Sequence, residues 1–222
     1  MIISNIKKRF FTSLILLILL ILMYFYSYVL IISLILISLV SWIEFYGLII
    51  KIYVKNKFID KFKRFIYKAL SLLFLSFVTF LIIIVEVKNP ELKIIIIYSL
   101  LVSVMSDLGG MIIGKIFKGK KLTKISPNKT ISGSIGAFIF SLLLVPLFYQ
   151  KLFNYNFLSL IIITLIISLT SQIGDLLISL LKRKAKVKDT SDLLPGHGGF
   201  LDRIDGILFA IPIGFLLFNL FL

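Results

Sequence analysis

Long stretches without any charged side chain are the feature that most constrains this chain. Residues 10–43 carry no charge, and further apolar runs recur as far as the C-terminal end. A helix needs about 20 apolar residues to cross the hydrocarbon core of a bilayer, where every backbone amide must be paired inside the protein. Hydrophobic residues make up 59% of the 222 residues, and the mean hydropathy is +1.10. The sequence therefore predicts an all-α, polytopic membrane protein built as a helical bundle.

The apolar runs predict about seven transmembrane helices. Their expected positions are 10–26, 28–50, 65–85, 93–114, 131–149, 157–181 and 204–222. The first boundary is the weakest, but the aromatic cluster at residues 24–28 is typical of a membrane interface and favours two helices joined by a tight turn. We expect Pro146 and Pro212 to bend the fifth and seventh helices.

The charged residues predict the orientation of these helices. The formal net charge is +15, and 22 of the 25 Lys and Arg side chains fall in segments that alternate helices would place on one side of the membrane. The positive-inside rule makes that side cytoplasmic, with the N-terminus inside and the C-terminus outside. We therefore expect a multi-pass protein of the cell (inner) membrane. Because the basic excess follows from topology, it does not indicate a nucleic-acid partner.

Carboxylates inside apolar runs are the first sign of a functional site. Asp107 and Asp175 each lie within an expected helix, where an ionised side chain costs several kcal/mol unless it faces the bundle interior and meets a partner. A cation or a metal ion could be that partner; a hydrogen bond between packed helices is the alternative. Glu44 lies near the inner end of the second run, where it could join the site or reach out to the interface.

A second group of polar residues opens the last apolar run. Asp202 and Asp205 are spaced i, i+3 and so share one helical face. They could complement the helix dipole or ligate Mg²⁺, which prefers oxygen ligands and often bridges carboxylates to phosphates. The preceding segment, residues 195–199, reads Pro-Gly-His-Gly-Gly. Its glycines predict an irregular loop that permits positive φ and lets backbone amides approach a phosphate. His197 could donate to a phosphate there or be an ordinary loop side chain.

The segment 114–133 is a third polar element. It combines lysines with Ser126, Thr130 and Gly133 just before an expected helix start. Point charges, hydroxyl donors and open backbone amides are what polyphosphate binding requires. The positive-inside rule accounts for the lysines but leaves the Ser, Thr and Gly pattern unexplained. Ile116 follows the pair Gly114-Lys115, so the segment lacks the following Ser or Thr of a Walker loop.

Taken together, these motifs resemble the phosphatidate cytidylyltransferase (CDP-diacylglycerol synthase) family. The family signature has the form S-x-x-K-R-x₄-K-D-x₅-P-G-H-G-G-x-x-D-R-x-D, and residues 179–205 match it at every fixed position. The segment at 114–133 is similar to the family's G-[KR]…KL…ISPxKTxEG element, and residues 174–176 match its GDL motif. The resemblance covers residues 98–222.

The resemblance implies the substrates CTP and phosphatidic acid and the products CDP-diacylglycerol and pyrophosphate, formed at the cytoplasmic face of the membrane. It also implies Mg²⁺ as cofactor, with a second cation in some members, and is compatible with a homodimer. The implied metal ligands are Asp175, Asp202, Asp205 and Asp189. The other implied catalytic residues are Lys182, Arg183, Lys188, Arg203 and His197. The implied substrate-binding residues are Lys115, Lys121, Ser126, Lys129, Thr130, Gly133, Ser179, Gly196, Gly198, Gly199 and Asp107.

Several positions depart from the family pattern. Ser132 and Ile178 stand where the family usually has Glu, and residues 106–110 read Ser-Asp-Leu-Gly-Gly where it has D-T-[GA]-A-[YF]. Ser132 and Ile178 leave an inactive lipid-binding homologue as an alternative. Asp107 and Asp175 inside apolar runs leave a cation-coupled transporter open, and a CDP-archaeol-type synthase shares parts of this architecture. We expect an N-terminal transmembrane region of about three helices at 1–92 and a catalytic transmembrane region at 93–222, with cytoplasmic loops at 114–133 and 182–203.

Overall fold

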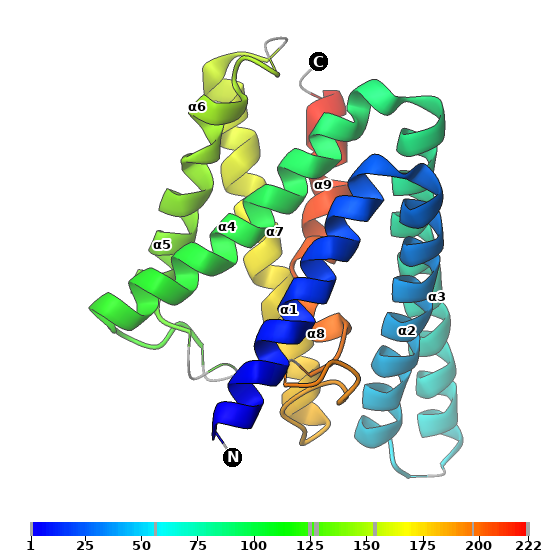
Figure 1. The fold of residues 1–222 in the computed structure, drawn as a ribbon. Helices are drawn as coiled ribbons and strands as arrows, with labels where there is room; N and C mark the ends of the chain where they lie inside the picture. Colours follow the sequence, from blue (N-terminus) through cyan, green and yellow to red (C-terminus); the bar gives the residue numbers. More distant parts are fainter. Residues whose placement is uncertain are drawn as a thin grey trace. The chain divides into compact units, whose positions relative to one another are not determined.

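The computed structural model of the chain describes residues 2–55, 57–123, 126, 129–152, 155–196 and 198–220. Helices dominate this part of the chain, and only two isolated β-bridges occur in it. The elements are α1 (Ile2–Phe25), α2 (Ser27–Ile52), α3 (Phe58–Lys88), a 3₁₀ turn η1 (Pro90–Leu92), α4 (Lys93–Phe117), α5 (Ile131–Leu142), α6 (Leu144–Phe148), α7 (Phe157–Lys184), α8 (Leu201–Ile204) and α9 (Ile207–Leu220) (Figure 1).

Each of the seven predicted apolar runs forms helix, which confirms the all-α class and the polytopic membrane bundle. Among the described residues, five helical segments have the length and composition to cross a bilayer: α2, α3, Pro90–Phe117, Ile131–Phe148 and α7. The apolar part of α1, Phe11–Phe25, is shorter, and α9 has 14 residues. At about 1.5 Å per residue, a 14-residue helix falls short of a 30 Å hydrocarbon core by itself.

The predicted turn between the first two helices is confirmed at Tyr26. This residue has an extended backbone, with φ −122° and ψ 105°, between the end of α1 and the start of α2. The fifth run is interrupted as well, because α5 ends at Leu142 and α6 begins at Leu144. Pro146 explains this break, since a proline lacks the N–H that would bond to the carbonyl four residues earlier and its ring crowds that carbonyl. Pro212, in contrast, lies inside a helix that runs on to Leu220.

The chain forms two compact units, each made of discontinuous stretches. The first unit contains Met1–Glu86 and Leu181–Ile204, and the second contains Val87–Leu180 and Asp205–Leu222. The sequence-based division at residue 92 stays a prediction. Within the first unit, α2 and α3 lie side by side (Figure 1). One hydrogen bond joins the start of α2 to the end of α3, and another joins inner turns of the two helices. The hydroxyl of Ser27 donates to Glu86 over 2.6 Å, and the indole nitrogen of Trp42 donates to the carbonyl of Lys68 over 3.1 Å.

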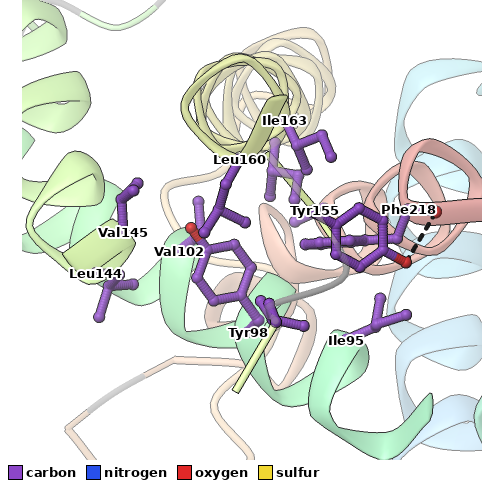
Figure 2. Packing of buried hydrophobic residues seen from close by; sticks show 12 residues of the cluster. Ile95, Tyr98, Val102, Leu144, Val145, Tyr155, Leu160, Ile163 and Phe218 are labelled. Atoms are coloured by element: carbon purple, nitrogen blue, oxygen red, sulfur yellow. Dashed lines mark hydrogen bonds between the residues drawn. The ribbon is translucent and has the colours of Figure 1, made fainter. Parts of the chain in front are cut away.

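The hydrophobic core of the second unit surrounds Tyr98 of α4. Its ring meets the ring of Phe148 edge to face, with centroids 5.2 Å apart. It meets the ring of Phe218 in the same way, with centroids 5.7 Å apart (Figure 2). Tyr155 contacts Phe218 in the same way and donates its hydroxyl to the Phe218 carbonyl over 3.0 Å. Lipid tails are as apolar as these side chains, so dispersion in close packing, more than removal from water, stabilises such a core.

Hydroxyl pairs join α4 to α7 across this core. Ser103 pairs with Ser171 over 2.7 Å, and Ser106 with Ser168 over 3.0 Å. Tyr98 pairs with Thr164 over 2.5 Å. Interhelical hydrogen bonds of this kind contribute about 0.6 kcal/mol each in membrane proteins. They fix the register of α7 against α4, and thereby the positions of Asp107, the residue after Ser106, and of Asp175, four residues after Ser171.

Candidate functional site

A cavity of about 340 Å³ lies in the second unit, among α4, the segment before α5, and α7. Six of the residues that the sequence predicted for the site line it: Asp107, Lys115, Lys129, Thr130, Gly133 and Asp175. These six residues come from three separated parts of the chain, and the fold brings them to one space. We call this space the Asp175 cavity.

An ion pair crosses the Asp175 cavity. The ammonium group of Lys129 contacts the carboxylate of Asp175, and both side chains are about one-quarter exposed. The hydroxyl of Ser179, one turn further along α7, donates to the other carboxylate oxygen over 3.3 Å. The cavity thus holds a paired charge, as the sequence required for Asp175, and offers both a cation and a carboxylate to a ligand.

The start of α5 positions the basic residues of the cavity. Thr130 caps this helix, because its backbone is extended and its hydroxyl oxygen accepts the Gly133 amide over 3.0 Å. Two backbone bonds tie the preceding segment to itself, from Leu122 N to Lys129 O (2.8 Å) and from Ile131 N to Lys120 O (3.0 Å). These bonds hold Lys129 at the helix N-terminus, where the dipole favours an anion.

Asp205 belongs to the same unit as Asp175. Its side chain is buried, at 7% exposure, and accepts the Gly206 amide over 2.9 Å. The backbone at Asp205 touches α7 next to Asp175: a Cβ atom added to Gly174 would lie 2.8 Å from the Asp205 carbonyl oxygen. This close approach explains why the residue before Asp175 is glycine, and it places the two predicted ligands on adjoining segments.

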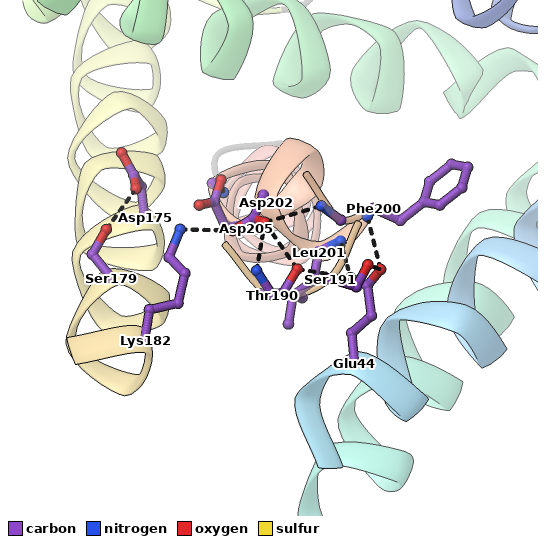
Figure 3. A network of polar contacts seen from close by, with 12 residues as sticks. Glu44, Asp175, Ser179, Lys182, Thr190, Ser191, Phe200, Leu201, Asp202 and Asp205 are labelled. Atoms are coloured by element: carbon purple, nitrogen blue, oxygen red, sulfur yellow. Dashed lines mark hydrogen bonds and ion pairs between the residues drawn. The ribbon is translucent and has the colours of Figure 1, made fainter. Parts of the chain in front are cut away.

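The first unit holds the other half of the predicted site, in the segment that connects α7 to α8. We call residues 185–201 the signature loop. Asp202, just after it, accepts Lys182 at 2.6 Å on one carboxylate oxygen, and the Thr190 and Gly199 amides at 2.8 and 3.1 Å on the other (Figure 3). Burial raises the pKa of Asp202, but Lys182 and the two amides outweigh it, so that this pKa lies below its usual value.

The glycine turn of the signature loop, residues 195–199, is closed by an isolated antiparallel β-bridge between Leu194 and Gly198. Leu194 and Gly198 exchange both backbone hydrogen bonds, at 2.8 and 3.1 Å. Gly196 and Gly198 have φ of +80° and +85°, which confirms the predicted positive φ. A Cβ atom on Gly198 would lie 3.0 Å from an Asp202 oxygen and 3.2 Å from the Asp189 side chain. Both acids therefore lie beside the turn. His197 lies outside the described residues.

The remaining predicted basic residues are exposed. Arg183, Lys188 and Arg203 lie on the last turns of α7, in the signature loop and on α8. Lys115 lies on the last turn of α4, and Lys121 lies in the segment after α4, where it forms a β-bridge with Thr130. Ser126 is half-buried and accepts the Lys129 amide with its carbonyl over 3.1 Å. None of these positions conflicts with phosphate binding.

Comparison with known proteins places this geometry in a family. The sequence pattern described as the cytidylyltransferase family matches residues 2–221. The chain belongs to the cytidylyltransferase family. Among curated relatives it is similar to proteins named phosphatidate cytidylyltransferase. It is 46% identical to those of Staphylococcus haemolyticus and Staphylococcus aureus over 121 residues, and 41% identical to that of Bacillus subtilis over 128. These matches cover 53–57% of this chain and 46–48% of the relatives, so they span about half of each relative's length.

The aspartates of this protein are arranged in pairs, and a pair of carboxylates could supply part of the ligand shell of a divalent cation. No group of three or more His, Asp or Glu side chains is gathered to hold a metal among the described residues. Each unit instead brings acids together in pairs, Asp189 beside Asp202 in the first and Asp107 with Asp175 around the cavity in the second. Mg²⁺ commonly takes one or two carboxylates and completes its shell with water and phosphate oxygens. The predicted set of four metal ligands stays a prediction.

Sequence reasoning missed some of the cavity. Gln172 also lines the space; its amide accepts the Ser134 hydroxyl over 2.5 Å and donates to Ser168 over 3.4 Å. A glutamine inside an apolar run is costly, like Asp175 three residues later, and that cost was the signal that could have found it.

Proposed function

We propose that this cytidylyltransferase family member is a phosphatidate cytidylyltransferase, which converts CTP and phosphatidic acid into CDP-diacylglycerol and pyrophosphate for phospholipid biosynthesis. One observation carries the proposal: Lys129, Thr130 and Asp175 meet at one cavity of a helical membrane protein whose signature is intact. The relatives are named phosphatidate cytidylyltransferase, which supports the choice of substrates.

The reaction is a single nucleotidyl transfer, in which the cytidylyl group of CTP moves to the phosphate of phosphatidate. A phosphate oxygen of phosphatidate forms a bond to the α-phosphorus of CTP, the bond from that phosphorus to the bridging oxygen breaks, and its electron pair leaves with pyrophosphate. The attacking phosphate is already ionised near neutral pH, so no general base is required. Catalysis then rests on aligning two anions and neutralising the leaving charge.

The residues divide these tasks. Lys129, Thr130 and Gly133 would hold a phosphate at the start of α5, together with Lys115, Lys121 and Ser126. Lys182, Arg183, Lys188 and Arg203 would stabilise the charge of the transition state. Ser179, Asp107, His197 and the glycines 196, 198 and 199 would shape the substrate site.

Asp175, Asp189, Asp202 and Asp205 would hold Mg²⁺, which when bound would neutralise charge on the pyrophosphate. CTP is cytosolic, and the acyl chains of phosphatidate stay in the bilayer. The site therefore belongs at the cytoplasmic face of the cell membrane, as the distribution of lysines predicts.

Incorporation of radiolabelled CTP into lipid tests the proposal. Purified protein in phosphatidate-containing micelles should yield labelled CDP-diacylglycerol with Mg²⁺ and none after chelation. An archaeal ether phosphate in place of phosphatidate distinguishes the CDP-archaeol alternative. No incorporation from either lipid would support the inactive homologue or the transporter and overturn the proposal.

Asp205→Asn is the first variant to measure. Loss of the carboxylate charge should lower Mg²⁺-dependent turnover by about 100-fold or more, while inserted, folded protein persists, since an amide oxygen can still accept the Gly206 N–H. Asp192→Asn is the matched control, because Asp192 is an exposed acid of the signature loop without an assigned role. Full activity of Asp205→Asn would contradict the metal assignment.

A further inference from the structure

Glu44 on α2 is a buried carboxylate that the proposed chemistry leaves without a role. Its side chain is 4% exposed, so it does not reach out to the interface, one of the two alternatives that its position in the sequence left open. A carboxylate in such a place costs several kcal/mol unless hydrogen bonds replace its hydration.

Four donors surround the Glu44 carboxylate, two on each oxygen. One oxygen accepts the Ser191 hydroxyl at 2.6 Å and the Phe200 amide at 3.1 Å. The other accepts the Thr190 hydroxyl at 3.0 Å and the Leu201 amide at 2.8 Å (Figure 3). All of these donors belong to the signature loop, 146 to 157 residues further along the chain.

The donors come from the two ends of the loop. Thr190 and Ser191 precede the glycine turn, whereas Phe200 and Leu201 follow it and supply amides at the start of α8. Amides at a helix start have no partner inside the helix, so the Glu44 carboxylate satisfies them from outside. One side chain thereby holds both ends of the glycine turn together.

Asp202 completes the arrangement from the other side. The Thr190 hydroxyl lies 2.9 Å from an Asp202 oxygen as well as 3.0 Å from Glu44. Gly199 contacts both acids: its amide donates to Asp202 over 3.1 Å, and a Cβ atom there would lie 2.5 Å from a Glu44 oxygen. Any movement of the loop that breaks the Glu44 bonds therefore also disturbs the partners of Asp202.

We infer that Glu44 is a positioning residue of the reaction: it fixes the signature loop so that Asp189, Asp202 and Arg203 keep their places for metal and phosphate binding. The inference rests on the proposed function. It assigns a role to α2, in the part of the chain that precedes all of the family motifs quoted above. A carboxylate suits the site better than an amide, because either orientation of a glutamine would turn its NH₂ group toward a backbone N–H, of Phe200 or of Leu201, which cannot accept a hydrogen bond.

Hydrogen–deuterium exchange and kinetics of Glu44→Gln test this inference. Amides at residues 199–201 should exchange about tenfold faster than in the unchanged protein, equivalent to the loss of roughly one net hydrogen bond. Amides of α4 and α5 should not change. The Mg²⁺ and CTP concentrations that give half-maximal activity should each rise by about tenfold or more. Tenfold is the lower limit of the usual loss of metal affinity or activity when a residue that orients metal ligands is replaced.

The control is Ser41→Ala, one turn earlier on the same helix. Ser41 is fully buried, and its hydroxyl has no hydrogen-bond partner among the described residues, so its removal should leave exchange and kinetics unchanged. A purely structural role of Glu44 would lower the amount of active protein but leave the half-saturating Mg²⁺ and CTP concentrations as they were. That result would overturn the inference.

A second variant guards against failure to fold. If Glu44→Gln does not accumulate, Thr190→Val removes one donor and should shift exchange and half-saturation in the same direction by about threefold. Unchanged values in that variant would contradict the inference. Failure of the proposed function would look different. The protein without any substitution would then be inactive, but the amides at residues 199–201 would still exchange faster in Glu44→Gln.

Discussion

At the scale of single residues, buried acids of this protein are stabilised by specific donors. Asp202 has a side chain that is only 4% exposed, and it forms an ion pair with Lys182, which is 14% exposed. A buried ion pair offsets its desolvation only when further hydrogen bonds satisfy the carboxylate. Two loop amides supply them, together with the Thr190 hydroxyl, whose one proton Asp202 shares with Glu44. The same residue therefore organises the loop and is a predicted ligand.

The lowered pKa of Asp202 predicts a pH dependence of stability. Above the pKa of an unfolded aspartate, about 3.9, the carboxyl is ionised in both states and its stabilisation is fully present. As the pH falls through the lower pKa of the folded state, the stabilisation is lost, because the unfolded state binds the proton first. Thermal unfolding of detergent-solubilised protein should show a deficit of Asp202→Asn at pH 7 that shrinks by pH 3. A deficit independent of pH would contradict this assignment.

At the scale of the elements, close approach of backbones positions the site. Helices α4 and α5 pack through glycines: a Cβ atom on Gly136 would lie 2.7 Å from the Gly109 carbonyl oxygen, and one on Gly133 would lie 2.8 Å from the Gly110 carbonyl oxygen. Small residues at helix interfaces allow such contact in membranes. Because Thr130 and Lys129 directly precede α5, its packing against α4 also fixes the wall of the Asp175 cavity.

Gly136→Ala tests this packing. The added methyl group would overlap both the backbone of α4 and the side chain of Ile113, so we expect a destabilisation of about 1–3 kcal/mol, measured by thermal or denaturant unfolding in detergent. Gly110→Ala is the matched control on α4, since its Cβ atom would come no closer than 3.6 Å to a neighbour. Equal stability of the two variants would argue against close α4–α5 packing.

At the scale of the whole molecule, the membrane orientation decides which substrates can reach the site. Reaction with cytosolic CTP requires the segments at 114–133 and 182–203 to face the cytoplasm, as the positive-inside rule predicts. The rule acts through short basic loops, and 22 of the 25 Lys and Arg side chains of this chain fall on one predicted side.

The absence of cysteine makes the orientation directly measurable. Single cysteines can replace the solvent-exposed residues Lys120, Lys184 and Lys151. Each variant is then treated with a thiol reagent that does not cross membranes. In intact cells only Lys151→Cys should be labelled, and Lys120→Cys and Lys184→Cys should react after permeabilisation. Labelling of Lys120→Cys in intact cells would place the basic loops outside and contradict the proposed site.

The sequence alone determined the helices and the class of protein. Apolar runs of membrane-spanning length must form helices, because lipid offers no partner to a free backbone amide, and each predicted run is helical. The turn at Tyr26 and the positive φ of Gly196 and Gly198 were predicted for equally local reasons, interfacial aromatic residues and the lack of a Cβ atom. The signature residues likewise named the family before any contact was known.

Only the tertiary structure decided which residues meet. Nothing local to Glu44 distinguishes a residue that reaches the interface from one that holds Thr190, Ser191, Phe200 and Leu201, because these partners lie about 150 residues away. The pairing of Lys129 with Asp175, and the presence of Gln172 in the same cavity, likewise depend on how α4, α5 and α7 pack. Local sequence patterns indicate whether a segment lies in lipid, at the interface or in water. The chemistry of the site depends on distances between segments, which are set by packing alone.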